Sequence, residues 1–124
     1  MTDSIISPQL AKNIKSKGIN LTEYATKDLR DNFYTQYYYN NNDVLQHSES
    51  YIEDWVPALR VSELRTFFEL NNNLFIDVIL ENYTTYKCSI INTRNDKVIY
   101  NEVVDSGDEE EMYLNMLEYI VDNI

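Results

Sequence analysis

The sequence predicts an α+β domain, in which N-terminal helices precede an antiparallel sheet and a further helix closes the chain. Apolar residues recur at helical spacing in the first forty residues and in the last twelve, whereas 74–104 contains three β-rich runs separated by turn residues. Of the 124 residues, 44% are hydrophobic and 25% are charged. These values are typical of a folded protein, so we expect a single globular domain over 1–124.

The first region, 8–40, is expected to form a helical hairpin. Ser7 followed by Pro8 is a typical helix start, and Gly18 is a typical helix end. The second helix begins near residue 22 and ends in an asparagine-rich run, because consecutive asparagines are poor helix formers. Its apolar positions recur every four residues, at Ala25, Leu29, Phe33 and Tyr37.

The next region, 48–70, is expected to be largely helical. Ser50 with Glu53 three residues later has the form of a capping box, and Pro57 interrupts the helix that follows it. The stretch 62–70 fits a helix and a strand almost equally, because its apolar residues satisfy both periods. We favour a helix, whereas a strand would add a fourth member to the sheet.

Three strands and one helix are expected to complete the chain. The β-rich runs 74–80, 84–91 and 97–104 indicate an antiparallel meander. A helix over 108–123 follows, with Asp108 or Ser106 as its N-cap and acidic residues in its first turn, where the helix dipole favours them. One face of this helix is apolar at Tyr113, Met116, Leu117, Ile120, Val121 and Ile124, so it should cover the sheet.

The charge of the chain is strongly negative and unevenly distributed. The formal net charge is −11, residues 1–30 contribute +2 and the remainder −13, and no Lys or Arg follows Lys97. Such a body repels a nucleic-acid backbone and attracts a basic protein. We therefore expect a protein partner with a basic nucleic-acid-binding surface and no direct nucleic-acid contact, except through the first thirty residues.

The sequence contains no recognisable catalytic or cofactor motif. His47 and Cys88 are the only residues of their kinds, too few for a zinc site of soft ligands, and Cys88 lies in a predicted strand as a small core residue. Glycine occurs only at positions 18 and 107, which excludes a glycine-rich phosphate loop. We expect no enzyme activity, metal or cofactor. We also expect a cytoplasmic protein without a membrane segment, because no leader or long apolar run is present.

The candidate site is a set of carboxylates near the C-terminus. These residues are Asp105, Asp108, Glu109, Glu110, Glu111, Glu118 and Asp122. Exposed aromatic residues could supply anchors for a partner, at Tyr37, Tyr38 and Tyr39, although tyrosines at helical spacing also suit a core. The carboxylates permit two interpretations, a solvated face that keeps the domain soluble or a surface that imitates phosphates.

The stretch Asp108–Met116 resembles the acidic, aromatic-flanked segment of some small phage anti-CRISPR proteins. That resemblance implies stoichiometric inhibition of a nuclease, with the acids of residues 108–111 facing basic residues on the enzyme. Bacterial immunity proteins that neutralise nuclease toxins use similar chemistry. We therefore expect an acidic inhibitor of a basic nucleic-acid-binding enzyme, of anti-CRISPR, anti-restriction or nuclease-immunity type.

A second stretch, Lys15–Ala25, resembles the segment of small DNA-binding regulators and antitoxins in which a turn enters a helix. This resemblance implies the alternative function, a transcriptional regulator or antitoxin that contacts DNA through residues 8–30. An ordinary glycine-capped helical hairpin also accounts for the same residues.

Overall fold

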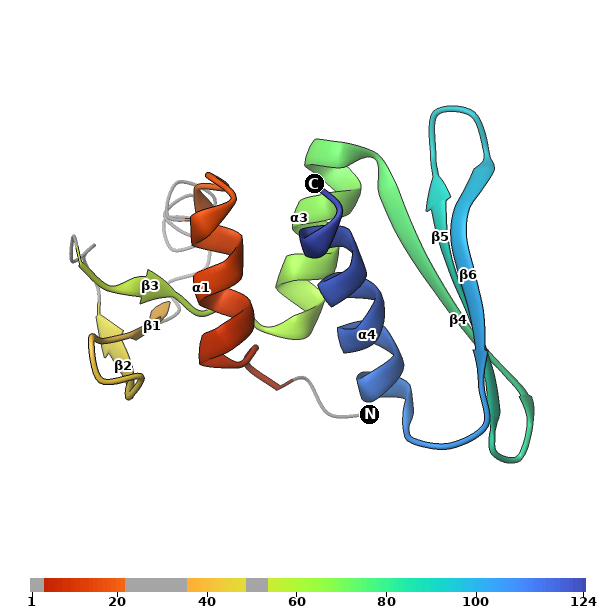
Figure 1. The fold of residues 1–124 in the computed structure, drawn as a ribbon, viewed down its shortest axis with the longest axis horizontal. Helices are drawn as coiled ribbons and strands as arrows, with labels where there is room; N and C mark the ends of the chain where they lie inside the picture. Colours follow the sequence, from red (N-terminus) through yellow and green to blue (C-terminus); the bar gives the residue numbers. More distant parts are fainter. Residues whose placement is uncertain (1–3, 22–35, 49–53) are drawn as a thin grey trace. The chain divides into compact units, whose positions relative to one another are not determined.

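The computed structural model describes residues 4–21, 36–48 and 54–124, whose helices and two three-stranded antiparallel sheets form an α+β fold (Figure 1). This confirms the predicted class, including the meander and the closing helix. The chain divides into two compact units, unit 1 (Met1–Ser4 and Val61–Asn123) and unit 2 (Ile5–Arg60 with Ile124). The single domain expected over 1–124 stays a prediction.

In unit 2, helix α1 (Pro8–Ser16) forms where the sequence predicts it. The side chain of Ser7 accepts a hydrogen bond from the Leu10 amide at 3.2 Å, and Pro8 occupies the first turn. At the other end Gly18 adopts φ +79°, and the Ile19 N–H donates to the Ile14 carbonyl. The left-handed glycine therefore ends the helix.

The second predicted helix of the hairpin is wrong at its C-terminal end, because residues 36–39 form strand β1 (Gln36–Tyr39), which pairs antiparallel with β2 (Leu45–Ser48). Aromatic residues favour strands, and the asparagine run makes the turn. The Asn40 side chain accepts hydrogen bonds from the backbone N–H groups of Asn42 and Val44. Residues 22–35, where the rest of that helix was expected, lie outside the described residues.

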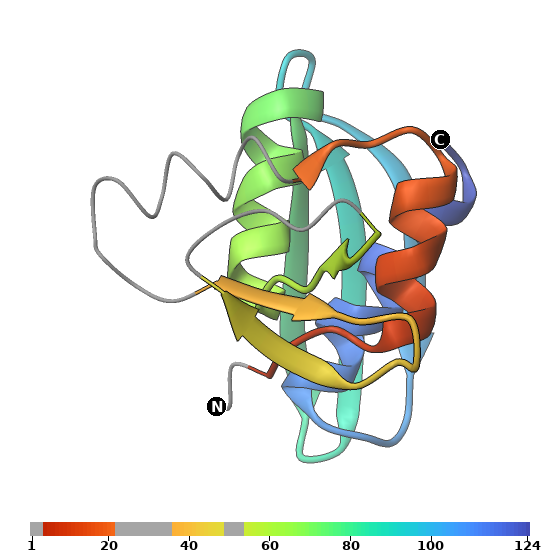
Figure 2. The same ribbon diagram turned by 90° about the vertical axis from the view of Figure 1, so that its left-hand side faces the viewer.

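The predicted helical segment 48–70 is wrong over residues 54–60, which are not helical and include the short strand β3 (Val56–Pro57). β3 pairs with β1, so the sheet order is β2-β1-β3 (Figure 2). Proline has no N–H group to donate to a neighbouring strand. Because β3 lies at an edge of this sheet, no strand on its outer side needs a donor from Pro57. Residues 49–53, which carry the proposed capping box, lie outside the described residues.

Unit 1 consists of two segments of the chain, which meet at residues 4 and 61. The Val61 amide donates a hydrogen bond to the Ser4 carbonyl at 2.9 Å, and next to it Ile5 and Arg60 of unit 2 form an antiparallel bridge. Helix α3 (Val61–Asn72) follows, which decides the ambiguous stretch 62–70 in favour of a helix. Asn73, with φ +57°, then turns the chain into the sheet.

The meander consists of β4 (Leu74–Asn82), β5 (Thr85–Asn92) and β6 (Lys97–Val104), in the order β4-β5-β6. Helix α4 (Glu109–Asp122) follows, and α3 and α4 cover the same face of the sheet (Figures 1 and 2). The core of this unit is built from the apolar stripes of both helices and the covered face of the sheet: Val61, Leu64, Phe68, Ile76, Cys88, Ile90, Met112, Tyr113, Met116, Leu117, Ile120 and Val121.

Candidate protein-binding surface

The carboxylates singled out in the sequence surround the start of α4 and continue along its exposed side. We call this set the acidic surface, and it comprises Asp105, Asp108, Glu109, Glu110, Glu111, Glu118 and Asp122. Asp105 lies in the turn that leaves β6 and accepts a hydrogen bond from the Thr85 hydroxyl at 3.4 Å. Asp108 is the N-cap of α4, and its side chain accepts from the Glu111 amide at 2.9 Å. A single turn therefore gathers five of the seven acids.

Gly107 fixes the course of this turn. Its φ is +108°, and a Cβ at this position would come within 2.6 Å of the Glu111 carboxylate and 3.0 Å of the Met112 methyl group. A side chain here would therefore require the Glu111 carboxylate and the buried Met112 methyl group to shift, and the positive φ would strain it in any case. The glycine lets the chain double back tightly enough for Asp108 to cap the helix.

The exposure of these acids follows the helical pattern. Glu111, Glu118 and Asp122 are exposed, whereas the opposite side of α4 is buried. Glu109 and Glu110 are half-buried. Ile124, which the sequence assigned to the apolar stripe, is 50% exposed, and Met112 is buried instead. Within α4 itself, the exposed acids are therefore spaced along the helix.

The two units differ sharply in formal charge. Unit 1 contains fourteen acidic and four basic residues, for −10, whereas unit 2 contains seven acidic and six basic residues, for −1. One of the four basic groups, Arg65, lies over the ring of Tyr113 with its guanidinium carbon 3.6 Å from the ring centroid. The acidity of the chain is thus a property of unit 1, and seven of the fourteen acids form the acidic surface.

The tyrosines proposed as anchors are mostly buried. Tyr38 is 2% and Tyr39 is 7% exposed, and the Tyr39 hydroxyl donates to the Ile6 carbonyl. The expectation that these two side chains are exposed is wrong, because β1 is the central strand of its sheet. Tyr37 is half-buried, with His47 against its ring edge at 6.2 Å between centroids and Arg60 5.8 Å from its centroid. It is the one proposed anchor with an accessible side chain.

Sequence reasoning missed the most exposed aromatic residue among those described. Tyr83, in the turn between β4 and β5, is fully exposed. The sequence did indicate this exposure, because Tyr83 lies beside Asn82 between two predicted strands. A residue at a hairpin turn has few neighbours to cover it. Phe75 on β4 is also 39% exposed.

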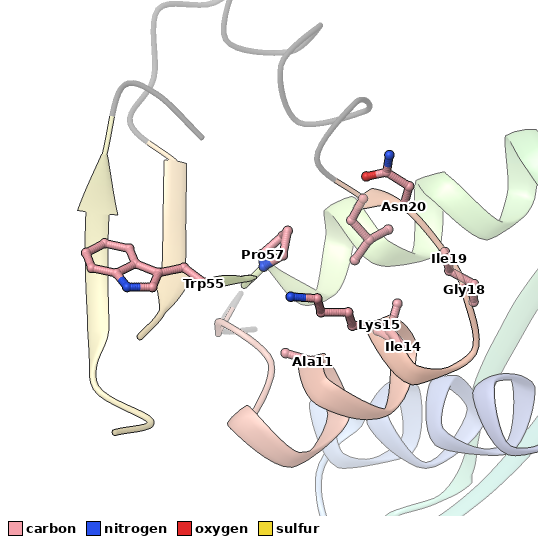
Figure 3. A pocket seen from close by; sticks show the side chains of 9 residues that line it. Ala11, Ile14, Lys15, Gly18, Ile19, Asn20, Trp55 and Pro57 are labelled. Carbon is pink, nitrogen blue, oxygen red and sulfur yellow. The ribbon is translucent and has the colours of Figure 1, made fainter. Parts of the chain in front are cut away.

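A cavity of about 250 Å³ lies in unit 2 (Figure 3). Lys15 reaches toward Pro57, whereas the Trp55 indole extends away from Lys15 (Figure 3). Among the described residues that line the cavity, Lys15 is the one charged group. The lining residues are Ala11, Ile14, Lys15, Gly18, Ile19, Asn20, Leu21, Trp55 and Pro57.

The titratable groups beneath α4 form a structural cluster. The Tyr100 hydroxyl donates to Glu102 at 3.0 Å, and this bond, with burial, raises the pKa of Tyr100. Cys88 is fully buried, as the sequence predicted, and burial and the nearby Glu102 charge raise the pKa of its thiol. A protonated, buried thiol is a poor nucleophile.

Among the described residues, no group of three or more His, Cys, Asp or Glu side chains is arranged to hold a metal ion.

The N-terminal basic residues are only partly described. Lys12, Lys15 and Lys17 are exposed on or just after α1, and Lys12 forms an ion pair with Asp43. The remainder of the stretch 8–30, which the alternative function requires, lies outside the described residues from position 22 onward.

Comparison of the chain with protein-family models, with curated proteins and with solved structures finds no match. None of the described helices is both long enough and apolar enough to cross a membrane. The fold and its charge define the chain as an α+β protein whose closing helix carries an acidic outer side.

Proposed function

We propose that the protein is a non-enzymatic inhibitor that docks its acidic surface on the basic nucleic-acid-binding surface of another protein. The observation that carries this proposal is the charge difference between the units, −10 against −1, together with seven acids and no Lys or Arg from Asp105 to the C-terminus. A body kept soluble by dispersed charge would not require this asymmetry.

The spacing of the acids suits imitation of a phosphate backbone. Glu111 and Glu118 are seven residues apart on α4, which at a rise of 1.5 Å per residue separates them by about 10 Å. This separation is comparable in scale with a few phosphate steps along one strand. A helix fixes the backbone positions from which its carboxylates project, so no backbone entropy is lost when a basic groove binds them.

Charge would govern the rate of association. A strongly negative face accelerates encounter with a positive one, and salt screens this attraction over about 10 Å at 0.1 M ionic strength. Partner binding should therefore weaken as salt is raised. Tyr37 of unit 2, half-buried beside Arg60, is the proposed aromatic anchor that remains accessible, and the role of the acidic surface in unit 1 does not depend on it.

The test replaces Glu109, Glu110 and Glu111 together by Gln and measures capture of the partner from host lysate, followed by the Kd with the purified partner. We expect the Kd to rise several-fold while the circular dichroism spectrum is unchanged. The matched control changes Asp43, Asp54 and Asp96 to Asn, which alters net charge equally at exposed positions outside the acidic surface. Equal affinity of both triple variants and the parent would refute the role of the acidic surface.

A gel-shift experiment separates this proposal from the DNA-binding alternative. With random duplex DNA in moderate salt, the acidic inhibitor should show no shift, whereas a regulator acting through residues 8–30 should bind. Duplex DNA should also compete with the protein for its partner, since both would occupy one groove. A shift that Lys12→Gln with Lys15→Gln abolishes would favour the regulator instead.

A further inference from the structure

Strand β4 forms an edge of its sheet. In the order β4-β5-β6 it pairs with β5 on one side, and no strand within residues 4–21, 36–48 and 54–124 pairs with the other. The strand is nine residues long, contains neither Pro nor Gly, and so presents a row of outward N–H and C=O groups. An edge of this kind can accept another strand.

Helix α3 packs on β4 beside this edge (Figure 2). A depression of about 150 Å³ lies between the two elements, and buried Ile76 contributes to its lining. We call it the docking groove, and it is lined by Ser62, Arg65, Thr66, Glu69, Leu74, Phe75 and Ile76. A strand added to β4 would therefore have a recess for side chains on its α3 side.

The two faces of β4 differ in character. The register places Ile76 opposite Ile90, and Ile90 opposite Tyr100, whose ring stacks on Tyr119 of α4, so these residues face the helices. Asp77 and Ile79 consequently face the other way. In a strand added to β4, one set of alternate side chains would lie beside the docking groove, and the other set would lie beside Asp77.

The charges along this edge favour a basic strand. Glu69 on α3 and Glu81 on β4 are exposed, and Asp77 is half-buried in the middle of β4. Arg65, the one basic residue among the described residues that line the docking groove, lies over the Tyr113 ring. Opposite charges on neighbouring strands are mutually stabilising, so Lys or Arg beside Asp77 is preferred.

We propose that the docking groove binds an extended segment of another protein, which adds to β4 as a fourth antiparallel strand. Its apolar side chains would enter the recess beside α3, and its Lys or Arg side chains would lie beside Asp77 and Glu81. Main-chain hydrogen bonds would supply affinity, and the alternating side chains specificity. A second copy of β4 fits less well, because antiparallel pairing about its centre brings the two Asp77 carboxylates near each other. This proposal uses a surface separate from the acidic surface and does not depend on it.

The probe is a terminally blocked eight-residue peptide of alternating lysine and valine, titrated into the protein by calorimetry. Two further peptides carry N-methyl groups, on all the lysine amides or on all the valine amides. In a strand, alternate amides point to opposite edges, so only one of the two sets can donate to β4. One methylated peptide should lose at least tenfold in affinity and the other less than twofold. If both bind like the parent peptide, attraction is purely electrostatic and strand addition is wrong.

Variants of the protein show which surface binds the peptide. Asp77→Asn should weaken binding several-fold, whereas the triple change of Glu109, Glu110 and Glu111 to Gln should alter it less than twofold. The reverse result would assign the peptide to the acidic surface and overturn the docking groove. Hydrogen exchange tests the proposal on the unaltered protein. Alternate amides of Leu74–Asn82 should exchange at least tenfold more slowly when the peptide is bound than when it is absent. Protection of those amides before peptide is added, in a protein that sediments as a dimer, would show a second copy in the groove.

Discussion

Tyr100 on β6 and Tyr119 on α4 stack with their ring centroids 3.8 Å apart and 16° between the ring planes. The two residues come from elements that follow one another in the chain, and their contact joins the edge strand β6 to the closing helix. Whereas α4 packs mainly on β4 and β5, this stack brings the third strand into contact with it as well.

Replacing Tyr119 by Leu should destabilise unit 1. The change keeps much of the apolar contact but removes the aromatic pair, which contributes about 1 kcal/mol beyond area burial. Urea unfolding followed by circular dichroism should show this loss in the free energy of unfolding. Tyr83→Leu is the matched control, because Tyr83 is fully exposed and its loss should leave the midpoint unchanged. Equal midpoints for both variants would show that the stack contributes nothing.

Replacing Tyr39 by Phe should change both stability and its dependence on alkaline pH. The variant removes the hydrogen bond from the Tyr39 hydroxyl to the Ile6 carbonyl, at a cost of about 1 kcal/mol near neutral pH. Burial raises the pKa of Tyr39 above its ordinary value of 10.0, so the folded state resists ionisation. The unfolded chain releases this proton first, and stability therefore falls as pH rises above about 10. Unfolding in urea at several pH values should show a shallower fall for the variant, and an unchanged slope would contradict this assignment.

Removing the charge of Glu102 should lower two pKa values at once. The hydrogen bond to Glu102 is the main cause of the raised pKa of Tyr100, and the carboxylate also raises that of Cys88. In Glu102→Gln both pKa values should move down, although burial should keep the thiol pKa above its ordinary value. The Cβ chemical shift of Cys88, the single cysteine, can be followed against pH. Glu118→Gln provides a control on the exposed side of α4 and should shift neither group.

The two glycines should respond differently to alanine. Gly107→Ala strains the backbone at φ +108° and places a Cβ 3.0 Å from the buried Met112 methyl group, so we expect a loss of about 2 kcal/mol in the free energy of unfolding. Gly18→Ala meets no atom within 4 Å, and only the cost of its left-handed backbone, about 1 kcal/mol, applies. Thermal unfolding of the two variants compares these effects directly. A smaller loss for Gly107→Ala than for Gly18→Ala would contradict the packing seen at the start of α4.

Elements formed by local sequence were predictable. The limits of β4, β5 and β6 fall within two residues of the β-rich runs, and Asp108 caps α4 as expected. Each of these is decided by neighbouring residues through strand propensity, turn residues or a cap. Tyr38 illustrates the opposite case, because its place in a central strand depends on pairing with Pro57, nineteen residues away. The four-residue spacing that ended at Tyr37 suggested a helix, and non-local pairing prevailed over it.

The candidate site was predictable only in part. Helical geometry alone places Glu111, Glu118 and Asp122 on one exposed side of α4. The half-burial of Glu109 and Glu110 depends on how α4 sits on its sheet. The docking groove could not be predicted, since it requires the strand order and the position of α3 beside β4. Neither is encoded in a short stretch of sequence.

The pairing of Ser4 with Val61 gives the chain an insertion topology. The polypeptide leaves unit 1 at residue 4 and returns at residue 61, and one hydrogen bond of 2.9 Å joins these two points. The two ends of the segment between them, 5–60, therefore adjoin, as the ends of an inserted segment do. A change of length within 5–60 that keeps the bond between residues 4 and 61 would therefore leave the two segments of unit 1 joined at the same point.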